Sequence, residues 1–151
     1  MDKRDTRMID VSGKKDSHRL ATASAGISMS RETLSLVKKN EIPKGNVLAV
    51  AQAAGIMAAK RTPDLIPLCH PLLLTAISID FSFPARGSSI VITATVRGRG
   101  KTGFEMEALT AAAVAALTIY DMCKMFDQGM VITDLRLVKK TGGKSGTYTA
   151  K

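Results

Sequence analysis

The order of strand-like and helix-like segments is the feature of this sequence that most limits its fold. From residue 21 to 30, apolar residues alternate with serine and glycine, which indicates a half-buried strand. The same alternation occurs on both sides of a turn that begins at Pro84, as in a β-hairpin. Ser30 is suited to cap a helix. We expect strands at about 21–30, 77–83, 90–97 and 130–139, and helices at about 31–39, 47–60 and 103–126.

This β-α-β-β-α-β order predicts an α+β fold of the ferredoxin-like type, a four-stranded antiparallel sheet with helices packed on one face. A chain of 151 residues without a linker or repeat is expected to form a single domain, 1–151, with residues 1–19 and 141–151 as candidate flexible tails. The second face of the sheet needs a cover that this chain does not supply. We therefore expect a homo-oligomer.

The composition indicates a cytoplasmic protein that does not cross a membrane. The longest uncharged apolar runs, 47–59 and 108–120, are shorter than the roughly 20 residues of a membrane span, and no apolar signal segment follows the charged N-terminus. Cys69 and Cys123 lack a C-x-x-C spacing, so we expect two thiols and neither a disulfide nor a zinc site.

The stretch from Lys60 to Pro71 has the character of a site, because three of the five prolines of the chain flank an acid, a thiol and a histidine. Proline restricts its own backbone and that of the preceding residue, so these side chains are held on a stiff loop. His70 is interpreted as a hydrogen-bond donor to a ligand, with a core histidine as the near-equal alternative. A metal site is disfavoured because no spacing unites His70 with other ligands.

The long helix places acids at both ends. Thr102 and Glu105 fit a capping box, which predicts a structural role for Glu105, whereas Glu107 begins a separate stripe that ends with Asp121 and Lys124. We slightly favour an ordinary surface ion pair at that end; the alternative is a proton-transfer pair with a lysine of depressed pKa. Because fourteen residues of helix span roughly 21 Å, one ligand can contact Glu107 and Asp121 only across two subunits.

The net charge of +9 indicates an anionic partner. Lys101-Thr102 and Lys144-Ser145 lie in glycine-containing basic segments that could hold an anion, but neither completes a Walker motif. An RNA-binding module on a basic ferredoxin-like sheet is the alternative function. The sequence disfavours nucleic acid as a partner, because aromatic residues are few and no RNP signature occurs.

Three longer motifs occur together and in order: K-R-T-P-D-L-I-P-L-C-H-P-L from Lys60, K-T-G-F-E-M-E-A-L-T-A from Lys101, and L-T-I-Y-D-M-C-K ending at Lys124. With I-D-V-S-G-K and G-G-K-S-G, they make the chain resemble the MoaC family of molybdenum-cofactor biosynthesis from about Met8 to Gly146. Gln52 and Asn46 depart from that pattern, where arginine and aspartate are usual. Asparagine can still cap a helix.

The resemblance implies a lyase that converts (8S)-3′,8-cyclo-7,8-dihydroguanosine 5′-triphosphate to cyclic pyranopterin monophosphate and releases pyrophosphate. It implies a hexamer, a trimer of dimers, with the active site at a subunit interface. We expect no resident cofactor or metal, and whether Mg²⁺ accompanies the triphosphate stays open, as does which lysine is acid and which is base. The implied catalytic residues are Lys44, Asp121 and Lys124, and the implied substrate contacts are Arg19, Lys60, Leu68, Cys69, His70, Met106 and Glu107.

Overall fold

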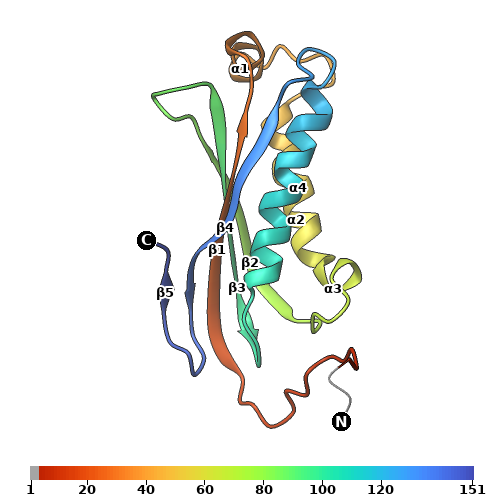
Figure 1. The fold of residues 1–151 in the computed structure, drawn as a ribbon, viewed down its shortest axis with the longest axis vertical. Helices are drawn as coiled ribbons and strands as arrows, with labels where there is room; N and C mark the ends of the chain where they lie inside the picture. The colour runs from red at the N-terminus through yellow and green to blue at the C-terminus, as the bar shows by residue number, and fades with distance from the viewer. Residues whose placement is uncertain (1–3) are drawn as a thin grey trace.

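One antiparallel sheet, with helices over one of its faces, organises the protein (Figure 1). The structure is a computed structural model and describes residues 4–151. Its elements are β1 (Ser17–Ser28), α1 (Arg31–Lys38), α2 (Val47–Lys60), α3 (Thr62–Leu65), β2 (Leu73–Ser82), β3 (Ser89–Gly100), α4 (Glu105–Cys123), β4 (Val131–Thr141) and β5 (Tyr148–Thr149).

The sheet has five strands in the order β2-β3-β1-β4-β5. The α+β class is confirmed, but the expected four-stranded sheet was incomplete. The predicted order missed β5, whose two residues pair with Lys139 and Lys140 at the edge of β4. Gly142, Gly143 and Gly146 have positive φ angles in the connecting turn, a conformation that glycine adopts without steric cost. The glycine-rich segment therefore folds the chain end back onto the sheet.

Side-chain caps define the starts of two helices where the sequence predicted them. The Ser30 hydroxyl accepts a hydrogen bond from the Thr33 amide at 3.1 Å, and the Asn46 side chain accepts one from the Ala49 amide at 3.0 Å. Each oxygen satisfies a backbone donor that the first helical turn leaves unpaired. These two caps fix the direction in which the chain enters α1 and α2.

The capping box predicted for α4 was wrong. Phe104 occupies the N-cap position without a side-chain cap, and the Thr102 hydroxyl donates instead to the Gly103 carbonyl oxygen. Glu105 pairs with Lys140 of β4, with its Oε1 2.9 Å from the Lys140 ammonium. The buried Phe104 ring anchors the helix start, because it fills the space beside Gly98 where an added Cβ would lie 2.6 Å from the ring.

Small residues let α4 lie close to both the sheet and α2. Gly55 of α2 approaches so closely that an added Cβ would lie 3.1 Å from the Ala111 carbonyl oxygen. Gln52 also ties α2 to β2, since its amide donates to the Ile79 carbonyl oxygen at 2.9 Å. The fully buried alanines of α4 are Ala108, Ala111, Ala112, Ala115 and Ala116. Although α4 is long and apolar enough to cross a membrane, 50% of that stretch is buried within the protein, as in a core helix.

The backbone of β4 is irregular at its centre. Asp134 has a positive φ of 54°, and the register between β1 and β4 shifts between Ser24 and Gly26. Both features indicate a bulge, which bends and twists the strand locally. The ladder then resumes, and the Lys139–Lys140 segment pairs with β1 on one side and with β5 on the other.

Candidate active site

The predicted site residues fall into two groups at opposite ends of α4. In Figure 1, α3 lies near the beginning of α4 and α1 lies near its end. One group, here called the lysine cluster, consists of Lys44, Asp121 and Lys124 at the end of α4. The other group surrounds the beginning of α4 and consists of Lys60, Leu68, Cys69, His70, Met106 and Glu107.

Asp121 connects the two lysines of the lysine cluster. The Lys124 ammonium lies 2.8 Å from Asp121 Oδ1, one helical turn away. The Lys44 ammonium, from the turn before α2, lies 3.5 Å from Asp121 Oδ2 and donates to the Asp121 carbonyl oxygen at 3.0 Å. Residue spacing alone suggested only the pair on the helix; Lys44 was implied by the family resemblance, because nothing local linked it to Asp121. The fold places a second cation on the same carboxylate.

The charges of the lysine cluster stabilise one another. The hydrogen bond from Lys124, with a smaller contribution from Lys44, lowers the pKa of Asp121 below its ordinary range, and the same contact with Asp121 raises the pKa of Lys124. The interpretation as an exposed ion pair is confirmed. The alternative, a Lys124 with a depressed pKa, is wrong for the single chain, because no cation or burial outweighs the adjacent carboxylate.

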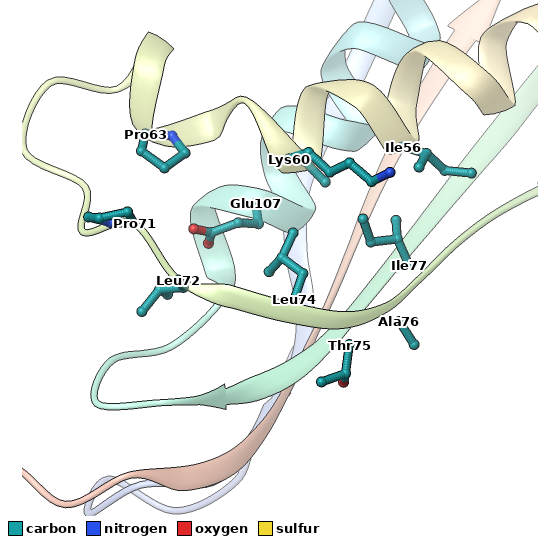
Figure 2. A pocket seen from close by; sticks show the side chains of 11 residues that line it. Ile56, Lys60, Pro63, Pro71, Leu72, Leu74, Thr75, Ala76, Ile77 and Glu107 are labelled. Atoms are coloured by element: carbon teal, nitrogen blue, oxygen red, sulfur yellow. The ribbon is translucent and has the colours of Figure 1, made fainter.

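A cavity of about 470 Å³ opens at the other end of α4, between β2 and α2 (Figure 2). Its walls are mostly apolar, with Lys60 and Glu107 as the charged residues among those that line it. In Figure 2 the Lys60 ammonium points along the side of Ile56 and Ile77, whereas the Glu107 carboxylate points toward Pro71. The cavity therefore presents a cation and an acid from two different walls.

A second cavity, of about 350 Å³, shares Glu107 and Leu72 with the first. We call it the His70 pocket. The loop with the prolines and the start of α4 form its walls, and Thr102, Gly103 and Glu105 complete it. The predicted residues that line the His70 pocket are Leu68, Cys69, His70, Met106 and Glu107. The structure thus brings together two motifs that are well separated in the sequence, residues 60–72 and residues 101–111.

Burial controls the protonation of the acid that joins the two cavities. Glu107 is only 2% exposed, and this burial, with a smaller repulsion from Glu105, raises the pKa of Glu107 above 4.5. Burial also acts to raise the pKa of Glu105, but the hydrogen bond and charge of Lys140, a backbone hydrogen bond and the charge of Arg19 together outweigh it, so the pKa of Glu105 lies below 4.5. Two neighbouring glutamates are therefore shifted in opposite directions, one toward a proton donor and one toward a fixed anion.

Cys69 and His70 are the other polar side chains that the loop with the prolines contributes to the His70 pocket. Burial, followed by repulsion from Glu107, raises the pKa of the Cys69 thiol, which favours the neutral form. His70 Nε2 donates a hydrogen bond to the carbonyl oxygen of Ile9 at 2.6 Å. Within residues 4–151, no group of three or more His, Cys, Asp or Glu side chains is arranged to hold a metal ion.

Arg19 lies beside this site and lines neither cavity. Its guanidinium donates to the carbonyl oxygens of Gly100 at 3.1 Å and Lys101 at 3.2 Å. Arg19 thereby holds the turn that leads from β3 to α4, and it also contributes to the low pKa of Glu105. Sequence reasoning missed Glu105 and Leu72 as lining residues, although both lie inside the motifs that it identified.

The sequence comparison decides the family. Residues 8–143 match the MoaC family. The chain belongs to the MoaC family. Its MoaC relatives include a protein of Peptoclostridium acidaminophilum, 57% identical over 142 residues, which are 94% of this chain and 89% of the relative. A relative from Rhodospirillum rubrum is 57% identical over 95% of this chain and 86% of its own length.

A third MoaC relative, from Geobacillus kaustophilus, is 55% identical over 96% of this chain and 91% of its own length. All three relatives carry the name cyclic pyranopterin monophosphate synthase. The matched region includes both ends of α4, the loop with the prolines and the turn that carries Lys44. The lysine cluster and the His70 pocket therefore both lie within the part of the chain that defines the family.

Proposed function

We propose that this chain converts (8S)-3′,8-cyclo-7,8-dihydroguanosine 5′-triphosphate to cyclic pyranopterin monophosphate and pyrophosphate, a step of molybdenum-cofactor biosynthesis. The observation that carries this proposal is the 57% identity, over 94% of the chain, to a cyclic pyranopterin monophosphate synthase. The reaction opens a purine-derived ring, recloses it as a pterin and forms a cyclic phosphate. Each stage moves protons close to a polyanion.

The lysine cluster has the chemistry that such a reaction needs. Lys44 and Lys124 supply two cations that can neutralise phosphate oxygens, and Asp121 orients both. Arrival of a second anion would compete for the two ammonium groups and would free the Asp121 carboxylate to accept a proton. We assign proton transfer to Lys124 with Asp121, and phosphate contact to Lys44.

The His70 pocket supplies the complementary part of the site. A glutamate whose pKa is raised by burial holds its proton more readily than an exposed one, so Glu107 is suited to donate a hydrogen bond or a proton to a ring nitrogen or oxygen. His70, Leu68, Cys69 and Met106 line the same pocket and would contact the substrate. Lys60, in the adjoining cavity, would hold a negatively charged part of it.

The two groups act on one substrate only if they come from different subunits. Glu107 and Asp121 are separated by fourteen residues of one helix, roughly 21 Å along its axis. We propose that the lysine cluster of one subunit faces the His70 pocket of a neighbour within a cytoplasmic hexamer, a trimer of dimers. We further propose that β4-β1-β3-β2 form a ferredoxin-like unit, which the observed strand order supports.

The proposed partner is a small phosphorylated nucleotide derivative, without nucleic acid and without a resident cofactor. Mg²⁺ would act only as a companion of the triphosphate, because the residues near both cavities include the cations Lys60 and Lys140. Mg²⁺ is usually held by substrate phosphates, several waters and no more than one or two carboxylates, which fits this companion role. A filter-binding titration with RNA across salt concentrations checks the exclusion of nucleic acid.

Incubation with the cyclised nucleotide triphosphate tests the function directly. The expected result is that pyrophosphate and the pterin product form in equal amounts. A phosphate assay measures the pyrophosphate, and chromatography measures the pterin. Lys124→Ala protein of the same oligomeric state serves as the inactive control. A folded, oligomeric wild-type protein that forms neither product would exclude this activity.

A further inference from the structure

A segment of the chain itself occupies hydrogen-bond donors of the proposed site. Residues 9–12, here called the N-terminal strap, precede β1 and lie outside the helices and strands. The Ile9 carbonyl oxygen accepts from His70 Nε2 at 2.6 Å, and the Ser12 carbonyl oxygen accepts from the Lys101 ammonium at 3.0 Å. Two backbone oxygens thus engage side chains from two different motifs.

The strap also encloses space next to the His70 pocket. A cavity of about 300 Å³ is lined by Leu68, His70 and Thr102, which line the His70 pocket as well. Its remaining walls include Ile9 and Val11 of the strap. The strap is therefore an outer wall of the site, placed on the same three residues that form the inner one.

Asp10 brings a negative charge to this location. Its Oδ1 accepts from the Ser12 amide at 2.8 Å, so the carboxylate is fixed to the strap. This hydrogen bond is the main cause of the lowered pKa of Asp10, and the charges of Lys101 and His70 act in the same direction. Asp10 therefore carries its negative charge at neutral pH, close enough to Lys101 and His70 for their charges to act on it.

We propose that the N-terminal strap is an internal competitor of the phosphorylated ligand: the Ile9 and Ser12 carbonyl oxygens occupy His70 and Lys101, and the Asp10 charge opposes an incoming anion, until the ligand displaces the strap. This proposal rests on the proposed function, because it assumes that His70 faces the substrate. A strap that must open reduces the apparent affinity in proportion to the fraction of open molecules.

The strap is held weakly enough to be displaced. Its contacts to His70 and Lys101 lie at the exposed surface, where hydrogen bonds and charge pairs contribute little. The Ile9 side chain is 71% exposed and adds no burial to resist opening. A polyphosphate carries several charges and can outcompete one carboxylate and one carbonyl oxygen for the same donors.

Calorimetric titration of pyrophosphate into the full-length protein tests the competition. Asp10→Asn removes the competing charge, so its affinity for pyrophosphate is expected to be about two- to fivefold higher than that of the wild type. Asp80→Asn is the matched control. It changes the net charge equally, but Asp80 is an exposed residue of β2 that lines none of the three cavities at this site, and its affinity should be that of the wild type. Equal or weaker binding by Asp10→Asn, relative to this control, would overturn the proposal.

Hydrogen exchange of the strap, residues 9–12, gives an independent readout. Saturating pyrophosphate should speed exchange of these amides, because displacement frees the strap. Slower exchange would mean that the strap closes over the ligand, which contradicts competition. Turnover of the cyclised nucleotide by the wild type is measured in parallel. Normal turnover without the expected changes in affinity and exchange would contradict only the strap proposal. Absence of turnover would contradict the proposed function.

Discussion

Lys44 and Asp121 are 77 residues apart in the sequence, and the Lys44 ammonium donates to the Asp121 carbonyl oxygen at 3.0 Å while lying 3.5 Å from its carboxylate. The turn before α2 is thereby fastened to the end of α4. Because Lys124 contacts the other carboxylate oxygen at 2.8 Å, Asp121 stands between two cations that would otherwise repel each other.

Lys124→Ala should lower kcat for the cyclised nucleotide by about 10²–10⁴-fold, the usual contribution of one acid–base group. The pair is exposed, so stability should change little. Single-turnover kinetics and thermal unfolding measure the two effects. Lys39→Ala, an exposed lysine at the C-cap of α1, is the control and should retain wild-type turnover. A Lys124→Ala protein with wild-type kcat would remove Lys124 from the mechanism.

Glu107→Gln should make the protein more stable at neutral pH and less active. Burial raises the pKa of Glu107 in the folded state above its ordinary 4.5, so the folded state binds this proton more tightly than the unfolded state does. Stability from this group is complete below pH 4.5 and is lost as pH rises through the folded-state pKa. The Tm of Glu107→Gln at pH 7 should exceed that of the wild type by about 2–4 °C for each kcal/mol regained.

Thermal scans from pH 4 to pH 8 check this expectation. The Tm difference between the two proteins should shrink toward the acidic end, because Glu107 is then protonated in both states. A Glu107→Gln protein whose Tm at pH 7 falls below that of the wild type would show that the charged form is stabilised in the assembled protein.

Mixed oligomers should recover activity that neither parent has. Glu107→Gln removes the acid at the beginning of α4, and Asp121→Asn removes the acid at its end. A pair of neighbouring subunits, one of each variant, can therefore form a site with an intact His70 pocket from one chain and an intact lysine cluster from the other. Random mixing after reversible dissociation should restore about a quarter of the sites, given two-chain sites in a symmetric assembly. Recovery is measured as pyrophosphate release. Mixtures no more active than the parents would place the complete site within one chain.

Asn46→Ala should lower the free energy of unfolding by about 1 kcal/mol, because the Ala49 amide loses its cap. Asn46→Asp keeps the acceptor and should be neutral or slightly stabilising, since a negative charge suits a helix N-terminus. Denaturant unfolding of the three proteins measures the difference. Equal stability of the alanine and asparagine forms would mean that water replaces the cap at no cost.

The sequence was most informative about segments whose signals are local. Ser30 and Asn46 marked helix starts because a cap acts within three residues, and the bounds of α2 agreed with the predicted 47–60. The capping box predicted from Thr102 and Glu105 was wrong, because the Thr102 hydroxyl donates to the Gly103 carbonyl oxygen and Glu105 pairs with Lys140, which is distant in the sequence. The short β5 gave no periodic signal, since two residues are too few for alternation.

For the candidate site, too, local signals were informative and contacts between distant residues were not. The stiff loop predicted from the prolines around His70 does line a cavity, and the helical spacing of Glu107 from Asp121 agrees with their positions near opposite ends of α4. The contact of His70 with Ile9 could not be predicted from the sequence, because every residue has a backbone carbonyl oxygen and the sequence does not indicate which one accepts a given hydrogen bond. Lys44 joined Asp121 only through the packing of α2 against α4.

The bulge at Asp134 bears on how the isolated chain behaves. Within residues 4–151, β5 pairs only with Lys139 and Lys140, so most of the outer edge of β4 keeps its backbone donors and acceptors unmatched by another strand. A straight edge of that kind would template strand-to-strand aggregation between newly made chains. The left-handed backbone at Asp134 interrupts the regular spacing that such stacking needs, so the isolated chain carries its own protection against fibril-like association.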